Sequence, residues 1–445
     1  MPRMSFMEAI AAGLQDGGVE LVTAYPGFGA HRLAGALGTE LFSINEKNAL
    51  AVAWGASVGG IRAASIFKNV GLNDAADPFI NACALGVRAG LVLVVIDDIR
   101  AGDSQLRLDS RPYSAFPCAL WLEPPTVGEA YRLTRESFSV SEQLQSPVVI
   151  RLTDLHLRCT ATEPVDRLPA DASSPPAAWQ NKPGRWVAHP AYGEYQRKRL
   201  QRREEAIQEW VDRQYSLPEA AGPVCRITFG LIPRHCVAER HLELFTLPVP
   251  GFLGRLARQV ERFEIWEHGC AWVCREILFG SFHSRLCHRA PTVPCSHRFH
   301  HASRYDDLYA LLRSVPRSIL VGDLGSYTLD THRSIEVCLC YGCSLGVATG
   351  LALALPDRRI FCVLGDGAFY HSAQAALQEA VARKVPLTVF LLDNGGTQDT
   401  GGQSIPGQVL LPEGLEYTRC TLSQVAGLKD ILQQQNALRL VHVVC

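Results

Sequence analysis

Continuously apolar runs alternate with helical patterns through the first third of the chain and again through its last third. The runs cover residues 19–24, 91–96 and 147–152 in the first region, and 360–364 and 387–392 in the last. Apolar runs without polar alternation are typical of strands in a parallel sheet that is covered on both faces. The pattern predicts an α/β fold with two parallel-sheet domains.

Two stretches of small apolar residues are predicted to be buried helices. They cover residues 49–64 and residues 337–356, and the second is the longest uncharged stretch of the chain. It contains three glycines and Ser344. A helix in the core of a large α/β domain explains it better than a membrane span does.

The composition changes between the two α/β regions. Residues 163–185 are rich in Pro, Ala, Asp and Ser, which is typical of a surface linker. Residues 195–213 follow with a basic helical pattern, but interleaved glutamates favour a solvated helix over a nucleic-acid site. A smaller α/β pattern comes next. We therefore divide the chain into an α/β domain, a linker with a charged helix, a small middle domain and a second α/β domain, at 1–160, 161–215, 216–285 and 286–445.

Length and charge narrow the class of protein. A chain of 445 residues exceeds what one core usually organises. Its 43 basic and 44 acidic side chains leave a net charge of −1, which argues against a nucleic-acid or membrane-surface partner. The first residues lack the apolar segment of a signal peptide. Fifteen cysteines without a small-domain framework indicate reduced thiols, so we expect a cytoplasmic enzyme.

The strongest local signal is Gly365-Asp366-Gly367 at the end of an apolar run. A helical pattern and a second apolar run follow, and that run ends in Asp393-Asn394. Side chains at the ends of two strands joined by one crossover helix emerge at the same carboxyl edge of a parallel sheet. A carboxylate, an amide oxygen and a backbone carbonyl suit Mg²⁺, which keeps its other positions for phosphate oxygens and water. The glycines and the helix N-terminus would receive the phosphates.

These residues resemble a known motif. Gly365-Asp366-Gly367 with Asp393-Asn394 looks like the thiamine diphosphate (ThDP) motif, and residues 400–403 resemble a run of the 2-oxoacid oxidoreductases. The resemblance extends over most of the chain to the large catalytic subunit of indolepyruvate ferredoxin oxidoreductases. The matching segments are 25–27, 45–47, 68–73, 76–78, 97–98, 104–105, 109–111, 295–298, 322–329 and 369–372.

The resemblance implies a ThDP-binding fold, in which residues 1–160 bind the pyrimidine and residues 286–445 bind the diphosphate. It implies Mg²⁺ ligands at Asp366, Asn394 and Gly396. Asn69 and Asn73 are expected to line the substrate pocket. The other residues expected to contact the cofactor are Tyr25, Pro26, Gly27, Asp323, Gly325, Ser326, Tyr327, Gly365, Gly367 and Thr397.

Glu46 is the residue that the resemblance makes most important. ThDP chemistry needs a carboxylate at pyrimidine N1′, which favours the imino tautomer of the cofactor. The alternative is that Glu46 only stabilises the start of a helix near Lys47. With the Mg²⁺ motif present, we favour the catalytic role.

Three histidines are expected to be catalytic. His31 and His371 are candidate acid/base groups near the reacting carbon, although each could equally be a hydrogen-bonded structural residue. His297, with Cys295, matches a loop that reaches the cofactor in the family. The histidines between 283 and 301 also suggest a zinc site, but they lack the ligand spacing of a zinc finger.

The cysteine motifs that bind the iron–sulfur clusters of the family do not occur in this sequence. Its iron–sulfur clusters lie in a domain with Cys-x₂-Cys-x₂-Cys-x₃-Cys-Pro runs, and this sequence has none. Cys338, Cys340 and Cys343 are interpreted as packing residues. Ser326 stands where the family has a cysteine. We therefore expect non-oxidative decarboxylation of a 2-oxoacid, with an aryl pyruvate (phenylpyruvate, 4-hydroxyphenylpyruvate or indolepyruvate) as substrate, or carboligation.

Two other functions stay open. The chain could keep the oxidoreductase reaction, with a small subunit or a ferredoxin supplying the clusters. It could also be a catalytically inactive assembly subunit. The family builds its site between the pyrimidine domain of one subunit and the diphosphate domain of another, which implies a homodimer.

Overall fold

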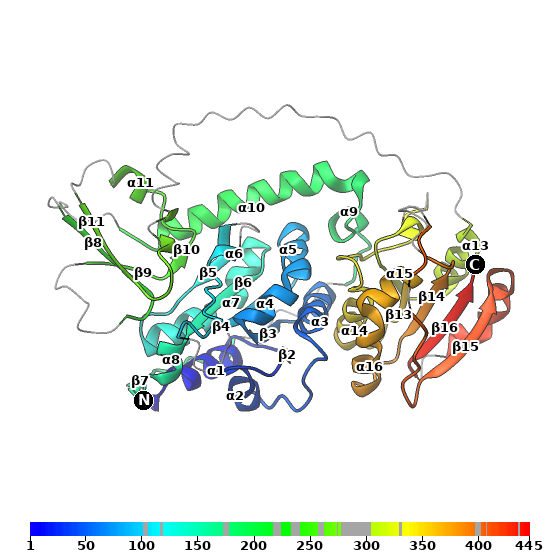
Figure 1. Ribbon diagram of the computed structural model, residues 1–445, viewed down its shortest axis with the longest axis horizontal. Coiled ribbons are helices and arrows are strands. Elements are labelled where there is room, and N and C mark those ends of the chain that lie inside the picture. Colours follow the sequence, from blue (N-terminus) through cyan, green and yellow to red (C-terminus); the bar gives the residue numbers. More distant parts are fainter. Residues whose placement is uncertain are drawn as a thin grey trace.

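The computed structural model describes residues 1–100, 106–115, 119–171, 178–216, 224–232, 241–256, 262–273, 275–276, 304–328, 332–396, 402–405, 407–434 and 437–445. Figure 1 shows two α/β units side by side, with a smaller sheet beyond the first unit. The long helix α10 (Gly193–Arg213) runs over the first unit. The two parallel sheets that the apolar runs predict are confirmed.

The first unit is built on a six-stranded sheet with the order β10-β5-β6-β4-β3-β2. Its strands are parallel except for β10, which pairs antiparallel with β5. The strands are β2 (Leu21–Ala24), β3 (Ala63–Lys68), β4 (Leu91–Asp97), β5 (Leu120–Leu122), β6 (Val148–Thr153) and β10 (Thr246–Leu247), and the helices are α1 (Phe6–Asp16), α2 (Ala30–Ala36), α3 (Glu46–Gly59), α4 (Asn69–Asp74), α5 (Ala76–Leu85), α6 (Pro112–Ala115), α7 (Val127–Leu144) and α8 (Asp154–Arg158).

The predicted helix at 49–64 is wrong at both ends. Helix α3 begins at Glu46, because Asn45 caps it by accepting a hydrogen bond from the Asn48 N–H (2.7 Å). It ends at Gly59, because Gly60 takes a left-handed conformation (φ 108°). The alanines that follow already belong to β3. Small apolar residues do not by themselves separate a buried helix from a buried strand.

The second unit holds a fully parallel five-stranded sheet with the order β12-β13-β14-β16-β15. The predicted helix at 337–356 starts only at Ser344, because Val337 and Cys338 form isolated β-bridges. The elements are α13 (Asp306–Ser314), β12 (Ser318–Gly322), η3 (Ser326–Thr328), α14 (Ser344–Ala354), β13 (Arg359–Gly365), α15 (Asp366–Ala368), the π-helical η4 (Phe369–Ala373), α16 (Gln374–Ala382), β14 (Thr388–Asp393), β15 (Glu416–Thr421), η6 (Leu422–Leu428), α17 (Lys429–Gln433) and β16 (Arg439–Val444).

The segment between the two units is less regular. Helix α10 lies where a solvated helix is predicted, and it buries only one face, with Ile207, Trp210 and Val211. The middle segment forms a three-stranded parallel sheet but also contributes β10 to the first unit. The remaining elements are β1 (Arg3–Met4), β7 (Glu163–Pro164), α9 (Pro183–Trp186), η1 (Pro190–Tyr192), β8 (Val224–Phe229), β9 (Leu242–Leu244), α11 (Leu253–Leu256) and β11 (Arg262–Glu267).

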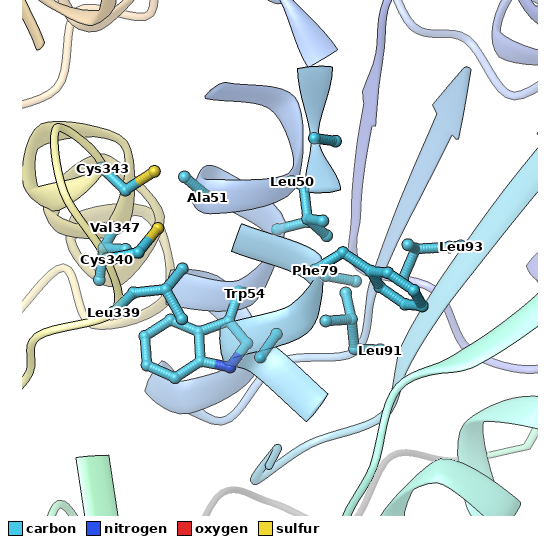
Figure 2. Packing of buried hydrophobic residues seen from close by; sticks show 14 of the residues in the cluster. Leu50, Ala51, Trp54, Phe79, Leu91, Leu93, Leu339, Cys340, Cys343 and Val347 are labelled. Atoms are coloured by element: carbon cyan, nitrogen blue, oxygen red, sulfur yellow. The ribbon is translucent and has the colours of Figure 1, made fainter. Parts of the chain in front are cut away.

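Helices α3 and α14 join the two units. Figure 2 shows side chains of α3, among them Ala51 and Trp54, beside Leu339, Cys340, Cys343 and Val347 of the second unit. The helix backbones approach closely, since a Cβ atom at Gly55 would lie 2.2 Å from the Val347 carbonyl oxygen. Glycines and other small residues therefore bring the two predicted domains into direct contact within one chain.

The ten cysteines that the structure describes form no disulfide bonds. None of the helices in the described residues combines the length and the hydrophobicity that a bilayer span requires.

Candidate active site

Glu46 is the first residue of α3 and is almost fully buried, with 9% of its surface exposed. Its Oε1 atom lies against Gly71 of α4, where an added Cβ would stand 2.3 Å away. Burial raises the pKa of the Glu46 carboxyl, and the negative charge of nearby Asp74 raises it further. A backbone hydrogen bond at Glu46 and the positive charge of Lys68 lower the pKa in part. A carboxyl that retains its proton more readily than usual can exchange that proton with a basic ring nitrogen.

A short series of contacts leads from Glu46 to the second unit. The next residue, Lys47, donates from Nζ to the carbonyl oxygen of Tyr341 (3.0 Å). The Tyr341 ring packs edge-on against His371, with 5.0 Å between ring centroids. His371 lies in the π-helical turn that follows Asp366. The start of α3 and the helical turn that follows Asp366 are therefore linked within a single chain, while the site shared between two subunits and the homodimer stay predictions.

The predicted Mg²⁺ ligands lie together at the carboxyl edge of β13 and β14. Burial raises the pKa of Asp366, backbone hydrogen bonds from Gly367, Gly396 and Gly395 oppose that rise, and the charge of Asp393 adds to it. The side-chain amide of Asn394 lies 2.7 Å from the Gly396 carbonyl oxygen. Asp366, Asn394 and Gly396 are thus neighbours, as strand-helix-strand topology requires.

This donor set fits a hard cation. Neither here nor elsewhere in the described residues do three His, Cys, Asp or Glu side chains come together as a metal site. A cation at Asp366 would therefore depend on amide and carbonyl oxygens as well as on the carboxylate, which is the ligand set that Mg²⁺ accepts. Gly396 has a φ of 147°, and a Cβ there would lie 2.3 Å from the Gln403 carbonyl oxygen, so this turn requires glycine.

Two residues predicted to bind the cofactor also shape the surrounding loops, and their contact with the cofactor stays a prediction. Asp323 is fully buried and accepts hydrogen bonds from the backbone N–H groups of Gly342 (2.8 Å) and Ser344 (3.0 Å). It therefore fixes the start of α14. The buried ring of Tyr327 lies against Gly325 and Gly365, so it supports the Gly-Asp-Gly turn from beneath. Ser326, between them, is exposed.

The predicted substrate asparagines are already engaged with neighbouring residues. Asn69 is buried, donates to the Leu108 carbonyl oxygen (2.7 Å) and accepts from the Val70 N–H (2.8 Å). Asn73 is exposed and accepts a hydrogen bond from the Tyr113 hydroxyl (2.8 Å). The geometry gives Asn69 a role in holding a loop and leaves Asn73 at the surface.

Of the three histidines, the structure describes two. His31 is exposed in α2 with its Nδ1 2.9 Å from the Gly27 carbonyl oxygen. This contact ties it to the Tyr25-Pro26-Gly27 turn after β2. His371 is exposed, and its Nδ1 lies 2.9 Å from the Ser372 hydroxyl. His297, Thr397, the run at 400–401 and the histidine loop that raised the zinc hypothesis lie outside the described residues.

A buried ion network at the carboxyl edge of the first sheet was missed. Arg151 pairs with Asp97 (2.7 Å), Asp109 (3.3 Å) and Glu123. Arg111 then joins Asp109 to the middle segment through Glu267 (2.6 Å). From the sequence, Asp97 and Asp109 were named only within segments that resemble the family, and no ion pair was predicted for them. Nothing local marks them as partners of an arginine on another strand.

Comparison with known proteins gives the class of the molecule. Residues 323–424 match the family described as thiamine pyrophosphate enzyme, C-terminal TPP binding domain. This segment contains Asp366, Asn394 and Gly396. The chain therefore carries a ThDP-binding domain, which supports the predicted thiamine diphosphate, while Mg²⁺ stays a prediction.

Related proteins of known name match most of the chain and share one name. Indolepyruvate oxidoreductase subunit IorA of Archaeoglobus fulgidus is 28% identical over 90% of this chain and 76% of its own length. The subunit of the same name from Thermococcus kodakarensis is 25% identical over 92% of this chain and 76% of its own. The chain is thus a ThDP enzyme that resembles IorA, as the sequence motifs indicate.

Solved structures confirm the fold. A ThDP-dependent 4-hydroxybenzoylformate decarboxylase from Rhodococcus jostii RHA1 superimposes with a TM-score of 0.54 at 15% identity, over 99% of this chain and 98% of its own. A benzoylformate decarboxylase from Polynucleobacter necessarius gives a TM-score of 0.55 at 12% identity over the same shares. At such low identity these likenesses concern the fold alone.

Proposed function

We propose that the chain catalyses the ThDP- and Mg²⁺-dependent, non-oxidative decarboxylation of an aryl pyruvate to the corresponding aldehyde. The observation that carries the proposal is Glu46, a buried carboxyl with a raised pKa at the boundary of the two units, linked through Lys47 and Tyr341 to the helix that Asp366 opens. The cofactor, when bound, supplies a carbon nucleophile and an electron sink for the 2-oxoacid.

Residues of the chain would bind the metal ion and transfer the protons. Asp366, Asn394 and the Gly396 carbonyl would hold Mg²⁺ and, through it, the diphosphate. Glu46 would keep a proton at its carboxyl and exchange it with the pyrimidine ring. His371, exposed beside Tyr341, would hold the proton that replaces CO₂ on the product.

The sequence supports a non-oxidative outcome. Within these 445 residues there is no Cys-x₂-Cys-x₂-Cys run to accept electrons. Cys340 and Cys343 are buried thiols in the core that joins the units, and Cys338 is buried in a separate hydrophobic cluster of the second unit. Burial raises the pKa of the Cys338 and Cys340 thiols well above the usual value, which disfavours the thiolates that metal clusters need.

A second function is favoured by the relatives. Because IorA subunits match nine-tenths of this chain, the chain could act as the catalytic subunit of a 2-oxoacid oxidoreductase whose clusters are on a partner. An iron assay on the complex isolated from its native source would reveal such a partner.

The test is direct. Purified protein with ThDP, Mg²⁺ and phenylpyruvate under nitrogen should release CO₂ and phenylacetaldehyde in equal amounts, and Glu46→Gln should reduce the release to a small residual rate. Turnover that appears only with ferredoxin and coenzyme A would establish the oxidoreductase instead. A protein that binds no ThDP in a calorimeter would be an inactive assembly subunit.

A further inference from the structure

Glu379 is a buried carboxylate of α16, in the second unit, that bonds to the first unit. Only 4% of its surface is exposed. It accepts hydrogen bonds from the Ser43 hydroxyl (2.9 Å), from the Ile44 N–H (2.9 Å) and from the Asn48 side-chain amide. Arg383, one turn further along α16, compensates its charge (2.8 Å).

The three donors surround Glu46 in the sequence. Ser43 and Ile44 belong to the segment that enters α3, and Asn48 lies in its first turn. The backbone N–H of Asn48 is bonded to the cap residue Asn45, so its side chain ties the same turn to Glu379 from the other side. One carboxylate therefore holds the turn from which the Glu46 side chain projects.

Holding the two units together does not require these bonds. The units already meet through the close packing of α3 and α14, where a Cβ at Gly350 would lie 2.0 Å from the Val52 carbonyl oxygen. The three donors from the first unit lie instead at the first turn of α3 and the residues before it, and charge-assisted bonds of this kind are strong and directional.

We propose that Glu379 is a positioning residue that fixes the orientation of Glu46 from the opposite domain. The proposal rests on the proposed function, in which Glu46 exchanges a proton with the cofactor. A carboxylate displaced by about 1 Å can lose on the order of 100-fold in rate. Loss of the Glu379 contacts should therefore act on the reaction through Glu46, although Glu379 is not itself placed at the reacting atoms.

A double-mutant cycle tests this inference. Glu379→Gln should lower kcat by about 10- to 100-fold with little change in KM. In the Glu46→Gln background the same change should lower the residual rate by less than about 2-fold, because the group it orients has gone. Glu413→Gln, the same substitution at an exposed site, should leave kcat unchanged. Losses that multiply independently would overturn the proposal.

A second measurement does not depend on turnover. Hydrogen exchange of the backbone at 44–48 should be faster in Glu379→Gln than in the wild type and in Glu413→Gln, and unchanged exchange would overturn the proposal. The affinity for ThDP, measured by calorimetry with Mg²⁺, should show the same coupling between positions 46 and 379. If the wild type binds ThDP but turns over no 2-oxoacid, the proposed function fails while exchange and affinity still decide the role of Glu379.

Discussion

The carboxylate of Glu46 occupies the space that a side chain at residue 71 would fill. Its Oε1, Cδ and Cγ atoms all lie within 2.6 Å of the position of a Cβ atom on Gly71. Gly71 lies in α4, which follows β3 directly, so a strand of the first sheet positions the backbone that the carboxylate contacts. The absence of a side chain there lets Glu46 stay buried at the boundary of the two units.

Gly71→Ala should therefore displace Glu46. A methyl group at 71 would meet the carboxylate, and a shift of about 1 Å is enough to cost on the order of 100-fold in kcat/KM. Gly35→Ala is the control, because a Cβ in that part of α2 meets nothing within 4 Å. The control should keep its activity and gain about 0.5–1 kcal/mol of stability. Equal activity of the two variants would contradict the assigned position of Glu46.

Asp74 should set the alkaline limb of the pH profile. The protonated Glu46 carboxyl is the form that can give a proton to the pyrimidine, so kcat/KM should fall as the pH rises through the Glu46 pKa. Asp74→Asn removes a negative charge that raises this pKa, so the alkaline limb should move to lower pH. Lys68→Met removes a charge that lowers it and should move the limb to higher pH. Shifts in the same direction in both variants would argue against this assignment.

Asp366 should control the dependence on Mg²⁺. Asp366→Ala removes the carboxylate from the predicted ligand set, and we expect a loss of about 10- to 100-fold or more in the affinity for Mg²⁺. Titration of ThDP at several Mg²⁺ concentrations would measure this loss, and chelation of the metal should abolish ThDP binding to the wild type. ThDP affinity that is independent of Mg²⁺ would exclude the predicted ligand set.

His371 is expected to be a stronger acid/base candidate than His31. His371 packs on Tyr341, whose carbonyl oxygen binds the neighbour of Glu46, whereas His31 is bonded to the turn after β2. His371→Asn should lower kcat by about 10²- to 10⁴-fold, the usual contribution of a general acid or base. His31→Asn serves as the comparison and should cost much less. Steady-state kinetics of the two variants would reverse the assignment if His31→Asn proved the slower enzyme.

Arg151 is expected to be important for stability. Arg151→Met would leave the buried carboxylates of Asp97 and Glu123 without their cation, which typically costs about 3–5 kcal/mol. Urea unfolding should show a lower midpoint for this variant. Arg202→Met, at an exposed position of α10, should stay within about 0.5 kcal/mol of the wild type. A midpoint unchanged by Arg151→Met would mean that the network contributes no net stability.

The sequence by itself determined the two parallel sheets and the meeting of Asp366 with Asn394. Both follow from local order, because continuous apolar runs form buried strands and one crossover helix places consecutive strand ends at one edge. Motif resemblance also indicated the cofactor, because Gly365-Asp366-Gly367 and Asp393-Asn394 stand in a strand-helix-strand context.

Only the tertiary structure decided which residues support Glu46. Glu379 and Ser43 are 336 positions apart, and no local period relates them. Asp323 and Asn69 are predicted at the cofactor and the substrate, and only the tertiary structure shows that they also hold backbone loops, because a motif gives a residue type without showing which neighbour it bonds. The end of α3 and the pairing of β10 with the first sheet depended likewise on contacts between distant segments, which are set by packing and which a sequence pattern does not record.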